Sequence, residues 1–258
     1  TELLDHAQRD VLLRLGRPAM GLALAAGILI AAEGFVPEGI GRLAIHWLAV
    51  LTALPVAIYG LGMGANLAGG RLSHHPSSGT VDDGAAVAVL LALALRLVAR
   101  ELRLERTTVT LLFTVGEEAQ MQGALAYVHD RKDWPLPARV INLEIVGQNG
   151  GYLLWEQDGT DIIRLPANPD LNFALERAVE ATTGEAAVRA PLINSDALAF
   201  LRRGIAAATL GSFDVVLGER GFHSALDDPG RIDPDRLVET TRVLEHLLAE
   251  MDAEPTRS

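Results

Sequence analysis

The stretch "TTVTLLFTVGEEAQMQG", residues 107–123, passes from an apolar segment into two adjacent glutamates. Its first nine residues are β-branched or apolar, which predicts a buried strand over 107–115, and the pattern over 117–130 predicts a helix. Functional groups collect where the strands of α/β sheets end, so Glu117 and Glu118 are candidates for a binding or catalytic site. The plainer alternative is that glutamates at a helix start interact with the helix dipole.

Helices and strands alternate on both sides of this stretch. A long helix is predicted before it, and the segments after it switch between apolar β-type runs and helical spacing of apolar residues. Such alternation predicts an α/β sandwich with helices on both faces of the sheet. The expected helices are 82–102, 170–183, 195–203 and 233–252, and the other expected strands are 139–147, 151–157 and 205–210.

The N-terminal region has a different composition. Residues 18–32 contain no charged side chain, and residues 43–70 contain none apart from a titratable His46. The second run exceeds the roughly 20 residues that cross a bilayer core as a helix. We therefore expect residues 1–72 to form an apolar helical hairpin and residues 73–258 to form a catalytic domain. The candidate transmembrane segments are about 18–35 and 43–68, and the alternative is a pair of buried soluble helices.

The charges are unevenly distributed along the chain. Residues 1–72 carry five acidic and five basic side chains, so residues 73–258 carry the whole formal charge of -11. The negative charge and the absence of clustered Lys and Arg argue against a nucleic-acid surface and favour a cationic or metal partner. There is no cysteine, so any metal must be bound by His, Asp and Glu.

The charges also bear on orientation. Acidic residues and arginines are spread over residues 1–17 before the apolar run, so we do not expect a signal peptide there. Arg9, Arg14, Arg17 and Arg71 flank one side of the hairpin, a weak bias that places the catalytic domain in the cytoplasm.

Glu144 is the strongest single candidate for a site. It lies in "INLEIVG" among apolar residues, and a charged carboxylate in a buried strand costs several kcal/mol unless something pairs with it. A metal ion would provide that pairing. Asp82, Glu118, Glu144 and His223 would together supply four ligands, and Glu117 would act on the metal-bound water as general base. Taken alone, Asp82 is equally suited to cap the helix that follows, and a loop histidine such as His223 is more often solvated.

Several motifs in order carry a resemblance to a known family. They are "GTVDDGAAVAVLLALA", "LLFTVGEEAQMQGALAYV", "VINLEIVG", "SDALAFLRRGIAAATL" and "FHSALDDPGRIDPDRL". Over residues 78–250 the chain resembles zinc-dependent aminopeptidases of the bacterial leucyl aminopeptidase and aminopeptidase Y type. The resemblance implies a three-layer αβα sandwich with a mixed, mainly parallel sheet and a site for two zinc ions. It also implies that Asp82 bridges the two ions, Glu117 is the general base, Glu118 and His223 bind one zinc, and Glu144 binds the other.

The chain departs from the family pattern at three places. Glu144 stands where the family usually has aspartate, "VDDGAA" differs from the usual residues after the bridging aspartate, and the His-x-Asp motif of the first histidine ligand is not found. His75 is a weak replacement ligand. We prefer the interpretation that the chain begins after the missing histidine, in which case the first strands of the sheet are missing as well.

The expected function is removal of N-terminal residues from peptides that have a free N-terminus, by a membrane-associated zinc peptidase. A different class of function is a catalytically impaired peptidase-fold module for binding or assembly at a membrane. A third hypothesis is an acyltransferase of the glutaminyl cyclase kind, which uses a single zinc. Metal content separates these hypotheses, because they require two, no and one bound zinc ions, respectively.

Overall fold

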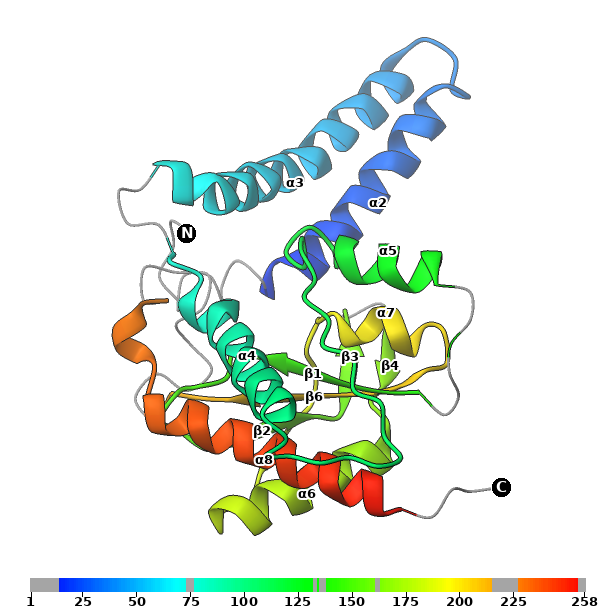
Figure 1. Ribbon diagram of the computed structural model, residues 1–258. Coiled ribbons are helices and arrows are strands. Elements are labelled where there is room, and N and C mark those ends of the chain that lie inside the picture. The colour runs from blue at the N-terminus through cyan, green and yellow to red at the C-terminus, as the bar shows by residue number, and fades with distance from the viewer. Residues whose placement is uncertain are drawn as a thin grey trace. The chain divides into compact units, whose positions relative to one another are not determined.

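The computed structural model describes residues 14–72, 77–131, 134, 138–160, 163–214 and 227–254 (Figure 1). The described residues fall into two compact units, one that extends to Ser77 and one that begins at Ser78. The described residues of the first unit form two helices, and those of the second form the sheet and the helices that cover it.

The N-terminal unit is a hairpin of α2 (Gly16–Glu33) and α3 (Ile40–Leu72). Both helices are long and apolar enough to cross a membrane, over Gly16–Glu33 and Ile40–Gly62. In these windows 11% and 6% of the residues are buried, and large apolar side chains such as Leu24 and Leu61 are 69% and 74% exposed. The hairpin therefore has little apolar core of its own, unlike a pair of buried soluble helices.

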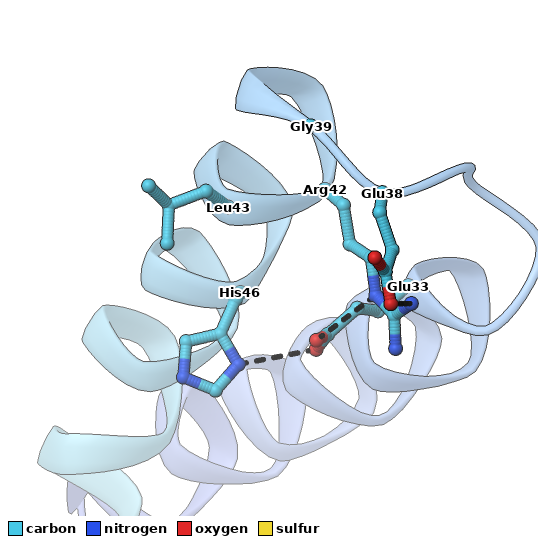
Figure 2. A pocket seen from close by; sticks show the side chains of 6 residues that line it. All are labelled: Glu33, Glu38, Gly39, Arg42, Leu43 and His46. Atoms are coloured by element: carbon cyan, nitrogen blue, oxygen red, sulfur yellow. Dashed lines mark hydrogen bonds and ion pairs between the residues drawn. The ribbon is translucent and has the colours of Figure 1, made fainter.

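A polar cluster joins the two helices at the turn end of the hairpin (Figure 2). Glu33, at the end of α2, lies 3.2 Å from His46 Nδ1 and 3.7 Å from Arg42 Nε, both on α3. Arg42 also lies 3.9 Å from Glu38 in the connector. These contacts cross-link the helices at the point where the chain reverses direction.

The second unit is built on a four-stranded sheet in the order β1-β6-β2-β5. Strand β1 (Arg139–Glu144) pairs in parallel with β6 (Ala206–Ser212), and β2 (Tyr152–Trp155) pairs in parallel with β5 (Val188–Ala190). The pair β2 and β6 is antiparallel, so the sheet is mixed and mainly parallel. A separate ribbon pairs β3 (Gln157–Gly159) with β4 (Arg164–Pro166).

Helices cover both faces of this sheet. On one face, α4 (Ala85–Val98), α6 (Pro169–Thr183) and α8 (Pro234–Ala253) share an apolar core with Leu143 of β1 and Leu210 of β6. On the other face, α5 (Gln122–Asp130) and α7 (Ala197–Leu201) pack against Ala207 of β6. Figure 1 shows α5 and α7 on one side of the sheet and α6 and α8 on the other. The predicted three-layer αβα fold is confirmed.

Three predicted elements are wrong in detail, and the first is the helix expected over 82–102, which is limited to Ala85–Val98. Residues 107–115 form no strand, because residues 108–113 make no backbone hydrogen bond to another described residue. The segment still has the alternation of a strand, since Leu111 packs against the core of the first face and Leu112 against that of the second. The helix expected over 117–130 begins at Gln122, because the turn before it requires positive φ at Gln120 and Met121.

Candidate active site

A single turn of π-type helix, Thr80–Gly84, presents two aspartates immediately before α4. Asp82 and Asp83 have non-helical backbone angles, and the peptide bond that joins them is cis. The turn is held from outside, because the Val81 N–H donates to Asp227 Oδ1 at 2.6 Å and the Ser78 hydroxyl donates to the Asp227 carbonyl at 2.7 Å. The helix therefore begins after the aspartates, and Asp82 is not its cap.

Glu144 is the last residue of β1 and lies in register with Gly211 of β6. The strand ends there because Ile145 takes φ +47, which is rare for a β-branched residue. The buried Ser212 hydroxyl supports this bend by donating to the Ile145 carbonyl at 3.2 Å. Burial raises the pKa of Glu144 well above its usual range, and the negative charges of Asp83, Asp82 and Glu117 raise it further.

Asp83 connects the acidic turn to the end of β1. Its carboxylate accepts hydrogen bonds from the backbone N–H groups of Ala86 and Ile145. Burial and the adjacent charge of Asp82 nevertheless raise the pKa of Asp83 to about 9. Its Oδ1 atom is buried and has no hydrogen-bond partner among the described residues, so it can accept a proton or a cation.

Glu117 and Glu118 lie in the turn that precedes α5. Gly116 has φ +73, and a Cβ on Gly123 would lie 2.5 Å from the Val115 carbonyl oxygen, so this turn requires glycine at both positions. Glu117 is partly buried and Glu118 is exposed. The charge of Glu117 reaches Glu144, so the turn brings this glutamate to the acidic cluster.

The structure therefore brings Asp82, Glu117 and Glu144 together, although they are far apart in the sequence. Partly buried carboxylates of like charge favour protonation or a bound cation, so their oxygen chemistry fits a divalent metal. Within the described ranges, however, no group of three or more His, Asp and Glu side chains is arranged to hold a metal ion. His223 and His75 lie outside the described residues.

Three polar residues near the cluster were not selected as site residues from the sequence. Asp227 holds the acidic turn, Asp196 lies close enough to raise the pKa of Asp83, and the Thr114 hydroxyl donates to Asp196 Oδ2. The quoted motifs "SDALAF" and "HSALDDPG" contain both aspartates. Their position within these motifs could have marked the two aspartates as site residues. A single aspartate in a loop or at a helix start, however, has no distinctive sequence pattern.

Comparison with known proteins identifies related sequences and folds. Residues 66–248 match the model of peptidase family M28. The chain is similar to the solved structure of BSAP, a zinc aminopeptidase from Bacillus subtilis, with 20% identity and a TM-score of 0.55 over 68% of this chain and 43% of that chain. It is also similar to the LapA aminopeptidase of Legionella pneumophila, with 16% identity and a TM-score of 0.55 over 69% of this chain and 47% of that chain. The chain thus spans less than half the length of these structures. No curated protein matched.

Proposed function

The chain belongs to peptidase family M28, and we propose that it hydrolyses peptide bonds with the help of zinc and removes residues from free N-termini. The observation that carries this proposal is the convergence of charge on Glu144, whose pKa is raised by burial and by Asp83, Asp82 and Glu117. A carboxylate alone on the surface would have neither the burial nor the neighbouring charges that raise this pKa. Perturbed carboxylates of this kind concentrate at functional sites.

In this proposal Asp82, Glu118, Glu144 and His223 would hold zinc. Zinc supplies Lewis acidity, which polarises the scissile carbonyl and makes a water molecule more acidic. Glu117 accepts the proton of the attacking water and transfers it to the leaving amine as the peptide C–N bond breaks. The partly buried position of Glu117 suits a group that moves protons, whereas Glu118 is exposed.

The matched substitutions Glu117→Gln and Glu118→Gln test the two assigned roles. We expect Glu117→Gln to keep its zinc and to lose at least about 100-fold in kcat, because a general base contributes that much or more. We expect Glu118→Gln to lose zinc, because it removes a charged ligand. Zinc content by elemental analysis and hydrolysis of an aminoacyl anilide measure both effects. Normal turnover by Glu117→Gln would show that the base is another residue.

Comparing a free peptide with the same peptide acetylated at its N-terminus tests the substrate class. An aminopeptidase cleaves the first and not the second. Equal cleavage of both peptides would contradict removal of N-terminal residues while leaving peptide hydrolysis intact.

We also propose that the α2–α3 hairpin spans a membrane and tethers the peptidase unit to it. The support is the length, apolar composition and low burial of both helices. If the hairpin holds the peptidase unit at the membrane, its substrate would be a peptide whose N-terminus lies close to the membrane surface.

A second candidate function is a peptidase-fold binding module without activity. It is favoured by the three departures from the family pattern, namely Glu144 in place of the usual aspartate, the altered "VDDGAA" and the missing His-x-Asp motif. Purified chain that contains no zinc and hydrolyses neither peptide would support the binding module over the peptidase.

A further inference from the structure

The segment that leads into Glu117 is not held by the sheet. Residues 108–113 make no backbone hydrogen bond to another described residue, although Leu111 and Leu112 pack against the cores of opposite faces. The hydrogen bonds of a sheet fix the register of a strand against its neighbour. Apolar packing is not directional, so it restrains the position of this segment along its axis less strongly. Contacts at the ends of the segment therefore contribute to the position of Glu117, together with the backbone hydrogen bond from the Met121 N–H to the Glu117 carbonyl.

A carboxylate fixes each end of this segment. At its start, Asp252 of α8 accepts hydrogen bonds from the backbone N–H groups of Glu105 at 2.9 Å, Arg106 at 2.7 Å and Thr107 at 2.7 Å. At its end, the Thr114 hydroxyl donates to Asp196 Oδ2. The second contact lies three residues before Glu117. The turn itself is bonded to the start of α5, because the N–H groups of Met121, Gln122 and Gly123 donate to the carbonyls of Glu117, Gly116 and Val115. The contact with Asp196 adds a restraint from the turn that leads into α7.

Asp196 is itself rigidly placed. Its neighbour Ser195 donates from both its backbone N–H, at 3.0 Å, and its hydroxyl to the carboxylate of Asp158, which is 2% exposed. The backbone of Ile193 is bonded to Gln157 and Gly159 of β3. On the other side of Asp196, the buried residues of α7 begin at Ala197. Asp196 thus lies on a turn that is fixed on both sides.

Asp196 also interacts electrostatically with Asp83. It is 8% exposed, and its charge acts on Asp83. Its second oxygen, Oδ1, is buried and has no hydrogen-bond partner among the described residues. One side chain therefore contacts the segment that carries the glutamates and lies close to the turn that carries Asp82.

We propose that Asp196 is a positioning residue that acts through Thr114 to hold the Glu117–Glu118 turn in place against Asp82 and Glu144. This inference rests on the proposed function, because the hydrogen bond between Thr114 and Asp196 is taken to position residues of the proposed zinc site. Neither Thr114 nor Asp196 is assigned to zinc binding or to the proton transfer. The loss of their hydrogen bond releases the turn without removing a ligand or the base.

Thr114→Val tests the contact, since valine keeps the shape of threonine and removes the hydroxyl. The matched control is Thr110→Val, because Thr110 lies in the same segment and is exposed. We expect the amide hydrogens of residues 121–123, which bond to the carbonyls of Glu117, Gly116 and Val115, to exchange about tenfold faster in Thr114→Val, as expected for loss of a partly buried hydrogen bond to a carboxylate. We expect no change in Thr110→Val and protection close to that of the unmodified chain in Thr114→Ser, which restores the hydroxyl.

Substitutions at Asp196 provide an independent arm. Asp196→Asn keeps an oxygen acceptor for the Thr114 hydroxyl, so the amides of the turn should exchange nearly as slowly as in the unmodified chain. Asp196→Ala removes the acceptor, so its amide exchange should be as fast as in Thr114→Val. In the double variant Thr114→Val, Asp196→Ala the amides of residues 121–123 should exchange no faster than in either single variant, because all three variants lose one shared contact. Additive acceleration would overturn the inference.

Zinc binding and kinetics connect this contact to the site. In Thr114→Val we expect zinc affinity and kcat each to fall about tenfold, with KM changed less than about twofold, because the turn loses position and the substrate contacts remain. Unchanged exchange, zinc affinity and kcat in Thr114→Val would overturn the inference with the peptidase function intact. An unmodified chain without zinc or hydrolysis would overturn the proposed function, and hydrogen exchange would still report whether Thr114 and Asp196 hold the turn.

Discussion

At the scale of single residues, this protein places carboxylates where burial opposes their charge. Asp83 and Glu144 both have raised pKa values, caused first by burial and then by neighbouring carboxylates. Two processes relieve such a cluster, namely proton uptake and binding of a cation. The burial of these carboxylates lowers stability, but it also allows the cluster to take up a proton or a cation, as is usual for functional sites.

Asp158 shows the same effect away from the cluster, and it provides a pH-dependent prediction. Burial raises the pKa of Asp158 from 3.8 to about 6, although two hydrogen bonds from Ser195 lower it. Because the folded-state pKa is above the unfolded value, the contribution of Asp158 to stability is full below about pH 4 and is lost as the pH rises through about 6. We expect Ser195→Ala to remove about 1–3 kcal/mol of unfolding free energy, with the larger loss at pH 8 because the ionised carboxylate then lacks a donor.

Urea unfolding at pH 5 and pH 8 measures this effect. Asp158→Asn is the control, because it removes the titrating group while it keeps an oxygen acceptor. Adding Ser195→Ala to Asp158→Asn should cost the same at both pH values. A cost of Ser195→Ala in the otherwise unmodified chain that does not change with pH would contradict the role of Asp158.

At the scale of elements, the register between β1 and β6 determines where Glu144 lies. Gly211 is opposite Glu144, and a Cβ on Gly211 would lie 2.6 Å from the Glu144 carbonyl oxygen and 2.5 Å from the Trp155 ring. These neighbours are backbone and a buried aromatic ring, so neither can move easily. Glycine at this position therefore allows the two strand ends to approach each other.

Gly211→Ala is expected to destabilise the fold by about 2 kcal/mol or more, because overpacking against fixed atoms costs that much. It should also lower the zinc content by displacing Glu144. The control is Gly184→Ala, where φ is +74 but no atom lies within 4 Å of the added Cβ, so we expect a loss of only about 1 kcal/mol. Thermal unfolding and zinc analysis distinguish the two variants, and equal losses in both would contradict the steric explanation.

The element before Glu117 shows how local preference and tertiary structure differ. The residues of 107–115 favour an extended backbone, and their side chains do alternate between the two cores. A strand also needs a partner that offers matching N–H and C=O groups, and none of the described residues pairs with 108–113. Side-chain carboxylates at the two ends provide the polar contacts instead.

At the scale of the whole molecule, the chain combines a charge-poor helical hairpin with an acidic α/β unit. A spanning hairpin places its connector on one side of the membrane and both of its ends on the other. The polar cluster of Glu33, Arg42 and His46 lies at the connector end, where charged groups can reach water.

Single-cysteine labelling tests this topology, and the chain suits it because it contains no cysteine. In sealed vesicles we expect a membrane-impermeant maleimide to label Glu38→Cys and Thr110→Cys from opposite sides, since Glu38 lies in the connector and Thr110 in the peptidase unit. Labelling after the vesicles are opened with detergent is the control and should reach both positions. Labelling of both from one side in sealed vesicles would contradict a spanning hairpin.

Much of the fold follows from local patterns in the sequence. The predicted helices 170–183 and 233–252 agree with α6 and α8 within one residue at each end, because Asn168 and Asp233 cap them with side-chain hydrogen bonds. The strands predicted at 139–147 and 205–210 correspond to β1 and β6, because continuous apolar runs favour buried strands. The uncharged N-terminal runs likewise indicate the two long helices.

Only the tertiary structure decided how these pieces meet. The order β1-β6-β2-β5, the irregular segment before Glu117, and the proximity of Asp83 and Asp196 depend on contacts between residues far apart in the chain. Local sequence determines backbone preference and which side chains avoid water, because these are properties of neighbouring residues. It does not determine which strand supplies a ladder partner or which carboxylates share a buried site, because those depend on the packing of the whole domain.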